Sequence, residues 1–295
     1  MTPYSTIPIQ NTLGEGPIYH QKRNSLFWTD IIENKIFELH LINNQIVTYP
    51  MPAKVGTIAI DKWDNLLLAL QGQIAIFNLQ NNTLNWLCDL EKDKPHNRPN
   101  DGKIGPDGNL WLGTMEIECK KGEGSFYCID TEGKTKKVLS HLSIPNGLVW
   151  AADHSLFYHI DSPNYAVKAY FFDSEKSEIT FLKIALQFSE NNGMPDGMAI
   201  DEEGMLWIAF WGGFSVQRWN PQTGQLMDTI SLPAPQITSC TFGGKNLDQL
   251  FITSARAGMS SADLEEYPES GNLFIKKMEV KGVNSFKFGE NLLFQ

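Results

Sequence analysis

The sequence lacks any cluster of basic residues. Its 295 residues include 24 Lys and Arg against 34 Asp and Glu, a formal net charge of −10. Nucleic acids and anionic membranes are bound by basic patches, so neither is expected as a partner. No apolar run approaches the ~20 residues of a membrane-spanning helix, and the N-terminal stretch lacks the basic and apolar parts of a signal peptide. We therefore expect a cytoplasmic protein.

Cysteines and the common catalytic motifs are also scarce. The four cysteines, Cys88, Cys119, Cys128 and Cys240, form no C-x-x-C pair, which argues against a disulfide framework or a cysteine-ligated zinc site and favours reduced thiols. The histidines form no H-E-x-x-H motif, and no glycine-rich phosphate loop is present. Ser254 has no histidine and acid placed to activate it, so a serine-nucleophile mechanism is not expected.

A short strand-like word recurs along the chain. Each copy has a turn residue, a flexible or polar residue, then Leu and a bulky apolar run. The copies are "NSLFWTD", "DNLLLAL", "GNLWLGT", "HSLFYHI", "GMLWIAF" and "DQLFITS", with their leucines at Leu26, Leu66, Leu110, Leu156, Leu206 and Leu250. The leucines are 40 to 50 residues apart, a period typical of four-stranded propeller blades.

A second strand-like segment follows most of these copies, and few windows show helical periodicity. These features predict an all-β protein with a single domain over residues 1–295, a six-bladed β-propeller around a central channel. A pair of β-sandwiches with accidental spacing is the alternative. We expect the ring to close by pairing an N-terminal strand near residues 4–9 with the last blade, at "NSFKFGENLLFQ".

Three stretches combine Pro, then Asn or Asp, then a nearby Gly, ahead of an apolar run. They are "RPNDGKIG", "IPNGLVWA" and "MPDGMAID". Their Asn100, Asn146 and Asp196 each lie ten residues before a repeat leucine, and Glu15 of "LGEGPIY" lies at nearly the same phase of the first repeat. Equivalent positions of successive blades converge on the channel axis, so we expect these four side chains to form a ring. The flanking Pro and Gly are expected to let the backbone turn sharply there.

Two carboxylates and two amide carbonyls suit a hard divalent cation such as Ca²⁺, Mg²⁺ or Mn²⁺. A bound cation would also explain why the carboxylates of Glu15 and Asp196 are placed together in the protein interior, because a buried carboxylate does not stay charged without a partner. The alternative is that these residues are turn formers without a shared purpose.

The ordered motifs "GEGP", "RPNDGK", "GTM", "PNGLVW", "IDS", "PDGMAID" and "TFGG" with "FITSA" run from about Gly14 to Ala255. Together they resemble the senescence-marker-protein/gluconolactonase/luciferin-regenerating-enzyme (regucalcin-like) family. That family consists of six-bladed propellers with one catalytic divalent metal ion in the channel, and its best-known members hydrolyse sugar lactones. Two departures from its pattern are Tyr19, where tryptophan is usual, and Gly105, where aspartate is usual; Tyr19 is expected to alter the pocket wall.

The resemblance implies roles for individual residues. Glu15, Asn146 and Asp196 match the metal ligands, and Asp196 also matches the proton acceptor and donor. Arg98 and Asn100 match substrate-contacting positions, and Asn100 is close enough to bind the metal directly or through water. Glu118 matches a sugar-binding glutamate, three residues after "GTM". We expect Asp161 to support the channel by hydrogen bonding, and Asp101 to satisfy backbone N–H groups of its own turn.

The resemblance therefore implies a metal-dependent lactonase that hydrolyses a small-molecule sugar lactone to an aldonic acid. Its cofactor would be one divalent metal ion, with Ca²⁺ preferred over Mg²⁺, Mn²⁺ or Zn²⁺. Two alternatives stay open: a phosphotriesterase of the diisopropyl-fluorophosphatase type, and a non-catalytic calcium-binding regulatory protein.

Overall fold

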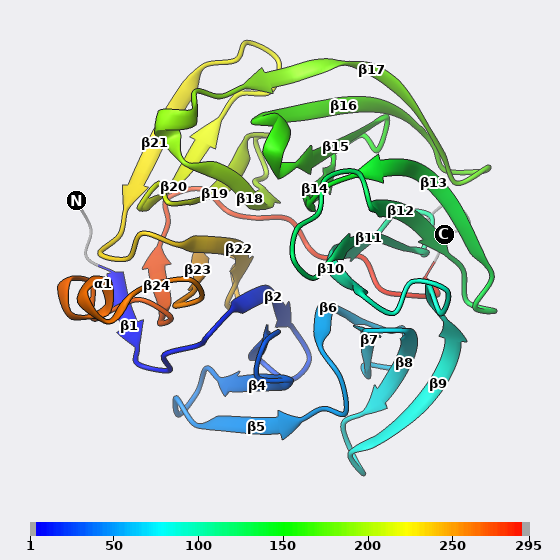
Figure 1. Cartoon of the computed structure of the whole chain (residues 1–295), viewed down its shortest axis with the longest axis horizontal. Helices are drawn as coiled ribbons and strands as arrows, with labels where there is room; N and C mark the ends of the chain where they lie inside the picture. Colours follow the sequence, from blue (N-terminus) through cyan, green and yellow to red (C-terminus); the bar gives the residue numbers. More distant parts are fainter. Residues whose placement is uncertain (1–3, 291–295) are drawn as a thin grey trace.

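Six four-stranded sheets surround a central channel in the computed structural model, which describes residues 4–290 (Figure 1). All pairs within the sheets for which a register is given are antiparallel, so each sheet is a propeller blade with its first strand innermost. The predicted all-β, six-bladed propeller is confirmed.

The strand bounds follow the chain blade by blade. Blade 1 contains β2 (Gly14–His20), β3 (Ser25–Asp30), β4 (Lys35–His40) and β5 (Ile46–Pro50), and blade 2 contains β6 (Val55–Ile60), β7 (Leu66–Leu70), β8 (Gln73–Asn78) and β9 (Thr83–Asp89). Blade 3 contains β10 (Asn97–Ile104), β11 (Leu110–Glu116), β12 (Gly124–Ile129) and β13 (Thr135–Leu142), and blade 4 contains β14 (Pro145–Trp150), β15 (Leu156–Asp161), β16 (Ala166–Asp173) and β17 (Glu178–Gln187). Blade 5 contains β18 (Met194–Ile200), β19 (Leu206–Trp211), β20 (Ser215–Trp219) and β21 (Leu226–Ser231), and blade 6 contains β22 (Ile237–Gly243), β23 (Gln249–Ser254), β24 (Leu273–Lys277) and β1 (Tyr4–Ile7).

The helices are short. They are the 3-10 turns η1 (Ser162–Asn164) and η2 (Glu190–Asn192) and the helix α1 (Ser261–Glu266), which Ser260 and Asp263 begin with a capping box. Among the described residues, no helix combines the length and the apolar character needed to cross a bilayer.

The hydrophobic core is divided into six clusters, one between each pair of neighbouring blades. The repeated word forms the second strand of each blade, and five of the six repeat leucines are buried in these clusters, while Leu156 is half-buried. Burying one such side chain stabilises the fold by roughly 1.5–3 kcal/mol. The repeat therefore exists because every blade needs the same apolar surface toward its neighbours.

The ring closes where the first strand of the chain joins the last blade. In blade 6, β1 pairs with β24, with Tyr4 opposite Lys276 and Ile7 opposite Leu273. Closure by an N-terminal strand on the last blade is thus confirmed, but the predicted partner segment is wrong. Strand β24 ends at Lys277, and the chain beyond it leaves the blade.

Residues 279–289, which we call the strap, instead cross one mouth of the channel (Figure 1, red). The strap is held by backbone hydrogen bonds: Glu202 N–H donates to Lys281 O at 2.8 Å, and Phe288 N–H donates to Ile60 O at 2.8 Å. Phe288 is buried in the cluster between blades 2 and 3. Residues 291–295 of the predicted closing segment lie outside the described residues.

A β-bulge interrupts every inner strand near its start. The register shifts between Glu15 and Ile18, Val55 and Thr57, Pro99 and Gly102, Asn146 and Leu148, Pro195 and Met198, and Ile237 and Ser239. A bulge leaves residues unpaired and re-aims their side chains. The repeated Pro-Asn/Asp-Gly stretches are therefore bulges, and the bulge of the sixth blade falls at Thr238.

Glycines next to the bulges permit close approach of neighbouring inner strands. A Cβ on Gly56 would lie 2.1 Å from Pro99 O, and one on Gly197 would lie 2.1 Å from Ser239 Oγ. Neither glycine has a positive φ, so the expected sharp turn is not their function. Glycine is required because the next blade occupies the space of a side chain.

We predict that Gly56→Ala destabilises the protein by at least about 2 kcal/mol, because the added methyl group meets rigid backbone. Urea denaturation gives the free energy of unfolding. Gly72→Asn is the control, since Gly72 has φ +86° and open space around it, and asparagine tolerates that conformation. Equal effects of the two substitutions would contradict the close approach of β6 and β10.

Candidate functional site

Four predicted side chains meet at the end of the channel where the inner strands begin, which we call the site end. Glu15, Asn100, Asn146 and Asp196 come from β2, β10, β14 and β18, and each is less than 9% exposed. Each inner strand contacts its two neighbours around the ring. The structure therefore brings the four residues together at the bulges, as the repeat phase predicted.

Two oxygens of this ring are buried without a partner. Among the described residues, Asn146 Oδ1 and Asp196 Oδ1 have no hydrogen-bond donor. The other end of the Asn146 amide is fixed, because its Nδ2 donates to Ser162 Oγ at 3.0 Å. Leaving a buried acceptor unsatisfied costs about 1–3 kcal/mol. These two oxygens are therefore candidate ligands for a bound cation or hydrogen-bond donor from outside the chain.

Burial disfavours the charged form of both carboxylates of the ring. Burial, reinforced by the Asp101 charge, raises the pKa of Glu15 to about 8, although the Gly16 N–H and Arg98 oppose the shift. Burial likewise raises the pKa of Asp196 well above its ordinary value, and the charges of Glu15 and Asp101 add to it. A cation between these groups would restore their ordinary ionised state.

The donor set fits a hard divalent cation. Carboxylate and amide oxygens are the ligands that Ca²⁺, Mg²⁺ and Mn²⁺ prefer, and two of these oxygens lack partners. The part of the chain that the structure describes contains no group of three or more His, Cys, Asp and Glu arranged to hold a metal ion. Any cation at this ring would therefore depend on the asparagine oxygens.

Arg98 and Asn100 form a connected pair beside the ring. Arg98 Nη1 donates to Asn100 Oδ1 at 2.7 Å and to Pro99 O at 2.8 Å, and Asn100 Nδ2 donates to Pro145 O at 2.9 Å. The Asn100 oxygen thus already accepts a hydrogen bond, unlike that of Asn146. Burial lowers the pKa of Arg98, while the charges of Glu15 and Asp196 raise it, so the guanidinium lies near the two carboxylates.

Asp101 has a role at the site that sequence reasoning missed. It accepts the Gly102 N–H at 2.8 Å, so the predicted bond within its own turn is confirmed. Its charge also raises the pKa of both Glu15 and Asp196. Asp101 is therefore a third carboxylate of the channel, and the signal for it was its place beside Asn100 in a bulge that re-aims two residues.

Glu118 lies on the surface rather than in the ring. Its side chain is 76% exposed and approaches Lys120, with 3.5 Å between Oε2 and Nζ. The next residue, Cys119, is close enough to Arg98 for the guanidinium to lower the thiol pKa, against the burial that raises it. The turn after β11 therefore borders the site, and the sugar-binding role of Glu118 stays a prediction.

Asp161 and Ser162 hold the loop before Asn146. Asp161 Oδ1 accepts the N–H groups of Ser143 at 3.0 Å and Ile144 at 2.8 Å. These bonds fix the chain just ahead of Pro145 and Asn146, so the expected supporting role of Asp161 is confirmed.

Ser254 and His159 are structural. Ser254 Oγ donates to Asn272 O at 2.7 Å and is buried. His159 lies close to the rings of Phe126 and Phe157, and burial lowers its pKa to about 3, so it is neutral.

The two departures from the family pattern have local explanations. Tyr19 lies near Gly243, and its hydroxyl donates to Asn24 Oδ1 at 2.7 Å. It lies near the end of β2, whereas Glu15 lies near the start, and the expected change of the pocket wall stays a prediction. At position 105, a Cβ would lie 2.5 Å from Asp107 Oδ1. Asp107 accepts the Trp111 indole N–H, as Asp201 accepts that of Trp207, and so replaces the missing aspartate.

The fold and the ring define a class: six-bladed β-propellers with a polar site at one end of the channel. Residues 13–256 match the SMP-30/gluconolactonase/LRE-like region, and the chain belongs to this family. It is 33% identical to regucalcin of Oryctolagus cuniculus over 281 residues, covering 93% of this chain and 94% of the relative.

Two solved structures are similar over nearly the whole chain. A regucalcin from Agrobacterium tumefaciens, described as a calcium-binding protein, has a TM-score of 0.93 and 27% identity, covering 98% of this chain and 99% of that one. A luciferin-regenerating enzyme has a TM-score of 0.89 and 30% identity, covering 97% and 99%. The family resemblance found in the sequence is thereby confirmed.

We predict that Glu15→Gln changes how the stability of the metal-free protein depends on pH. A folded-state pKa of about 8, against an ordinary value of 4.5, makes the contribution of Glu15 to stability largest at acidic pH. That contribution is lost as the pH rises toward 8. The variant should therefore melt progressively higher than the wild type from pH 5 to pH 8, by several degrees, since each pKa unit corresponds to about 1.4 kcal/mol.

The measurement is the melting temperature of both proteins with a chelator present. Saturating Ca²⁺ should raise the melting temperature of the wild type more than that of the variant. A constant difference between the two proteins from pH 5 to 9 would show that Glu15 is not protonated in the metal-free channel.

Proposed function

We propose that the protein is a metal-dependent hydrolase of sugar lactones. The observation that supports this most is the pair of buried, unpartnered oxygens on Asn146 and Asp196, beside a second carboxylate whose pKa burial raises. Membership of the SMP-30/gluconolactonase/LRE-like family supports the lactone as the substrate class.

Glu15, Asn146 and Asp196 would hold the divalent cation, with Asn100 adjacent through its bond to Arg98. When bound, such a cation acts as a Lewis acid that stabilises negative charge on a carbonyl oxygen. The regucalcin relative that is described as a calcium-binding protein favours Ca²⁺. The three ligands come from three different blades, so their spacing depends on the packing of the inner strands.

Asp196 would accept the proton from the water that attacks the lactone carbonyl and later give it to the ring oxygen that leaves. The bound cation would favour the ionised carboxylate of Asp196, which is the form that can accept a proton. Direct attack by Asp196 to form an acyl-enzyme is the alternative chemistry.

Arg98 and Asn100 would orient the substrate. An arginine carries five N–H donors, and the hydrogen bonds described for Arg98 come from Nη1, so donors on the rest of the guanidinium remain for sugar hydroxyls or the ring oxygen. Glu118 would contact a sugar hydroxyl from the rim, where the turn after β11 borders Arg98.

Calcium binding without turnover is the second candidate. The chain is similar to regucalcins, and the regucalcin from Agrobacterium tumefaciens is described as a calcium-binding protein. The same ring would bind the ion in either case. The two candidates differ in whether Asp196 moves a proton.

A lactone panel with controlled metal content tests the proposal. We expect hydrolysis of aldonolactones such as D-glucono-δ-lactone, measured by acid release, to stop after chelation and to resume with Ca²⁺, Mg²⁺, Mn²⁺ or Zn²⁺. An organophosphate triester in the same panel tests phosphotriesterase activity. Activity that survives exhaustive chelation, with no metal found by elemental analysis, would contradict the proposal. Calcium binding without hydrolysis of any lactone would select the second candidate.

We predict that Asp196→Asn lowers kcat by at least about two orders of magnitude, the usual scale for a general base. The variant keeps one carbonyl oxygen but cannot accept a proton, so saturating metal should not restore the rate.

Glu15→Gln is the matched control, since it also removes one charge from the ring without removing the proposed base. Its kcat should recover to a larger share of the wild-type value as the metal concentration rises. Equal recovery of both variants would reduce Asp196 to a ligand.

A further inference from the structure

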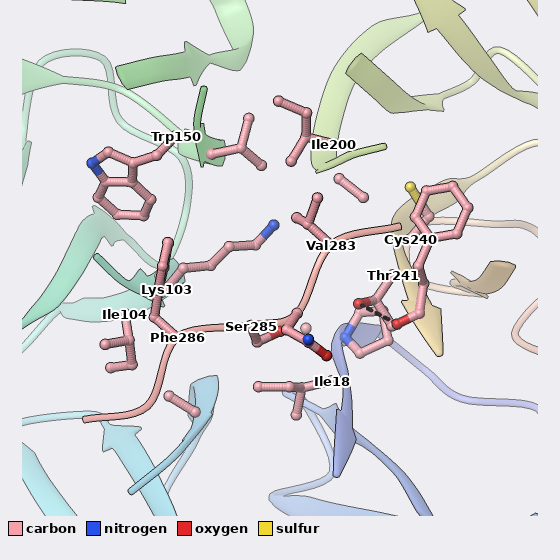
Figure 2. A pocket seen from close by; sticks show the side chains of 18 of the residues that line it. Ile18, Lys103, Ile104, Trp150, Ile200, Cys240, Thr241, Val283, Ser285 and Phe286 are labelled. Carbon is pink, nitrogen blue, oxygen red and sulfur yellow. Dashed lines mark hydrogen bonds between the residues drawn. The ribbon is translucent and has the colours of Figure 1, made fainter. Parts of the chain in front are cut away.

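One lysine reaches across the channel at the mouth opposite the ring. Lys103, on β10 of blade 3, extends its side chain into a cavity of about 280 Å³ that the strap also lines (Figure 2). Its Nζ donates to the backbone carbonyl oxygen of Met198, on β18 of blade 5. Blade 4 lies between these two blades in the ring. Among the described residues, no other hydrogen bond joins the inner strands of blades that are not neighbours.

The acceptor lies at the end of the bulge that carries Asp196. Pairing of β18 with β19 is interrupted after Pro195 and resumes at Met198. Met198 is fully buried, and a buried carbonyl oxygen without a donor is costly. The bond from Lys103 satisfies this oxygen and holds the backbone two residues after Asp196.

The backbone of this bulge matters because the Asp196 side chain has few bonds of its own. The other three residues of the ring each have a described side-chain hydrogen bond. Asp196 Oδ1, in contrast, has no partner among the described residues. The Asn146 amide is near enough to lower the pKa of Asp196, but its described bond goes to Ser162. The direction of the Asp196 carboxylate therefore depends on its backbone.

The surroundings of Lys103 suit a fixed internal donor. Asp101 and Asp201 also line the cavity, and the charge of Asp101 raises the pKa of Lys103 against the burial that lowers it. Much of the remaining lining is apolar, including Ile104 and Ile200 (Figure 2). The charge of the amino group is thus offset within the channel, and its described hydrogen bond goes to β18.

We propose that Lys103 is a positioning residue for Asp196, which holds the bulge of β18 from across the channel and so keeps the carboxylate directed at the ring. None of the four ring residues lines the cavity, so Lys103 acts on Asp196 through the backbone. The consequences for cation binding and turnover rest on the proposed function; the hold on β18 does not.

Hydrogen exchange in the metal-free full chain tests the hold on the bulge. Lys103→Met keeps an apolar side chain of nearly the same length but removes the donor. We expect amide exchange in β18 (Met194–Ile200) to become at least about tenfold faster, because local opening is easier, and exchange in β14 (Pro145–Trp150) to change by less than about twofold. Lys103→Arg, which keeps a donor, should exchange like the wild type.

Two further variants complete this test. Lys287→Met is the matched control, because it removes a positive charge of the strap that pairs with Asp64 and has no described bond to β18. It should leave exchange in β18 within about twofold of the wild type. Lys103→Gln, whose shorter polar side chain does not reach Met198 O, takes the place of Lys103→Met if that variant does not fold.

Calorimetric titration with Ca²⁺ tests the consequence at the ring. Lys103→Met should bind Ca²⁺ at least about tenfold more weakly than the wild type, the usual scale for residues that orient metal ligands. Removing a positive charge from the channel would by itself strengthen cation binding, so the sign separates positioning from charge. With saturating Ca²⁺ and an aldonolactone, kcat should fall at least about tenfold while KM changes less than about threefold.

Two results would overturn the proposal. One is exchange in β18 that is unchanged, or that accelerates equally in β14. The other is a folded Lys103→Met variant that binds Ca²⁺ as tightly as the wild type or more tightly. If the wild type bound no Ca²⁺ and hydrolysed no lactone, the proposed function would fail, while faster exchange confined to β18 would still support the hold of Lys103 on the bulge.

Discussion

The close packing of six inner strands around one channel is the constraint on which the rest of this structure depends. Their backbones approach so closely that a Cβ on Gly56 or Gly197 would overlap the next blade. Strands packed in this way cannot all stay regularly paired with their own blades, and each carries a bulge near its start. The bulge turns Asn100 and Asp196 toward the axis, and the glycine beside it lets the neighbouring strand pass. Packing and site are thus two consequences of one arrangement.

The same arrangement concentrates charge where water is excluded. Glu15, Asp101 and Asp196 lie in the channel with Arg98, whose described hydrogen bonds go to Pro99 and Asn100 rather than to a carboxylate. The pKa values of Glu15, Asp101 and Asp196 are raised mainly by burial. Burying these carboxylates costs free energy. The apolar clusters between the blades stabilise the fold independently of the channel, so the fold tolerates that cost. The cost is also what makes the channel responsive to ions, since any bound cation relieves it.

The strap shows how a segment outside the repeat completes the architecture. It leaves blade 6 after β24, crosses the channel and ends against blades 2 and 3, where Phe288 joins the core. Residues 284–289 of the strap belong to the segment that the sequence analysis assigned to the closing sheet, because their alternating polar and apolar residues resemble those of a strand. The strap could either pair with blade 6 or cover the apolar mouth of the channel. It covers the mouth, because β1 already occupies the edge of β24.

The period of the repeat leucines and the pattern of turn residues determined the six blades, because each blade must present the same apolar surface at the same place. The phase of the repeat also brought Glu15, Asn100, Asn146 and Asp196 to one level of the channel. Tertiary structure alone decided which oxygens are free. Arg98 occupies the Asn100 oxygen, while Ser162 turns the Asn146 amide so that its oxygen stays unpartnered. It also placed Asp101 near Glu15 and left Glu118 at the surface. These outcomes depend on contacts between different blades, and distance along the chain carries no information about them.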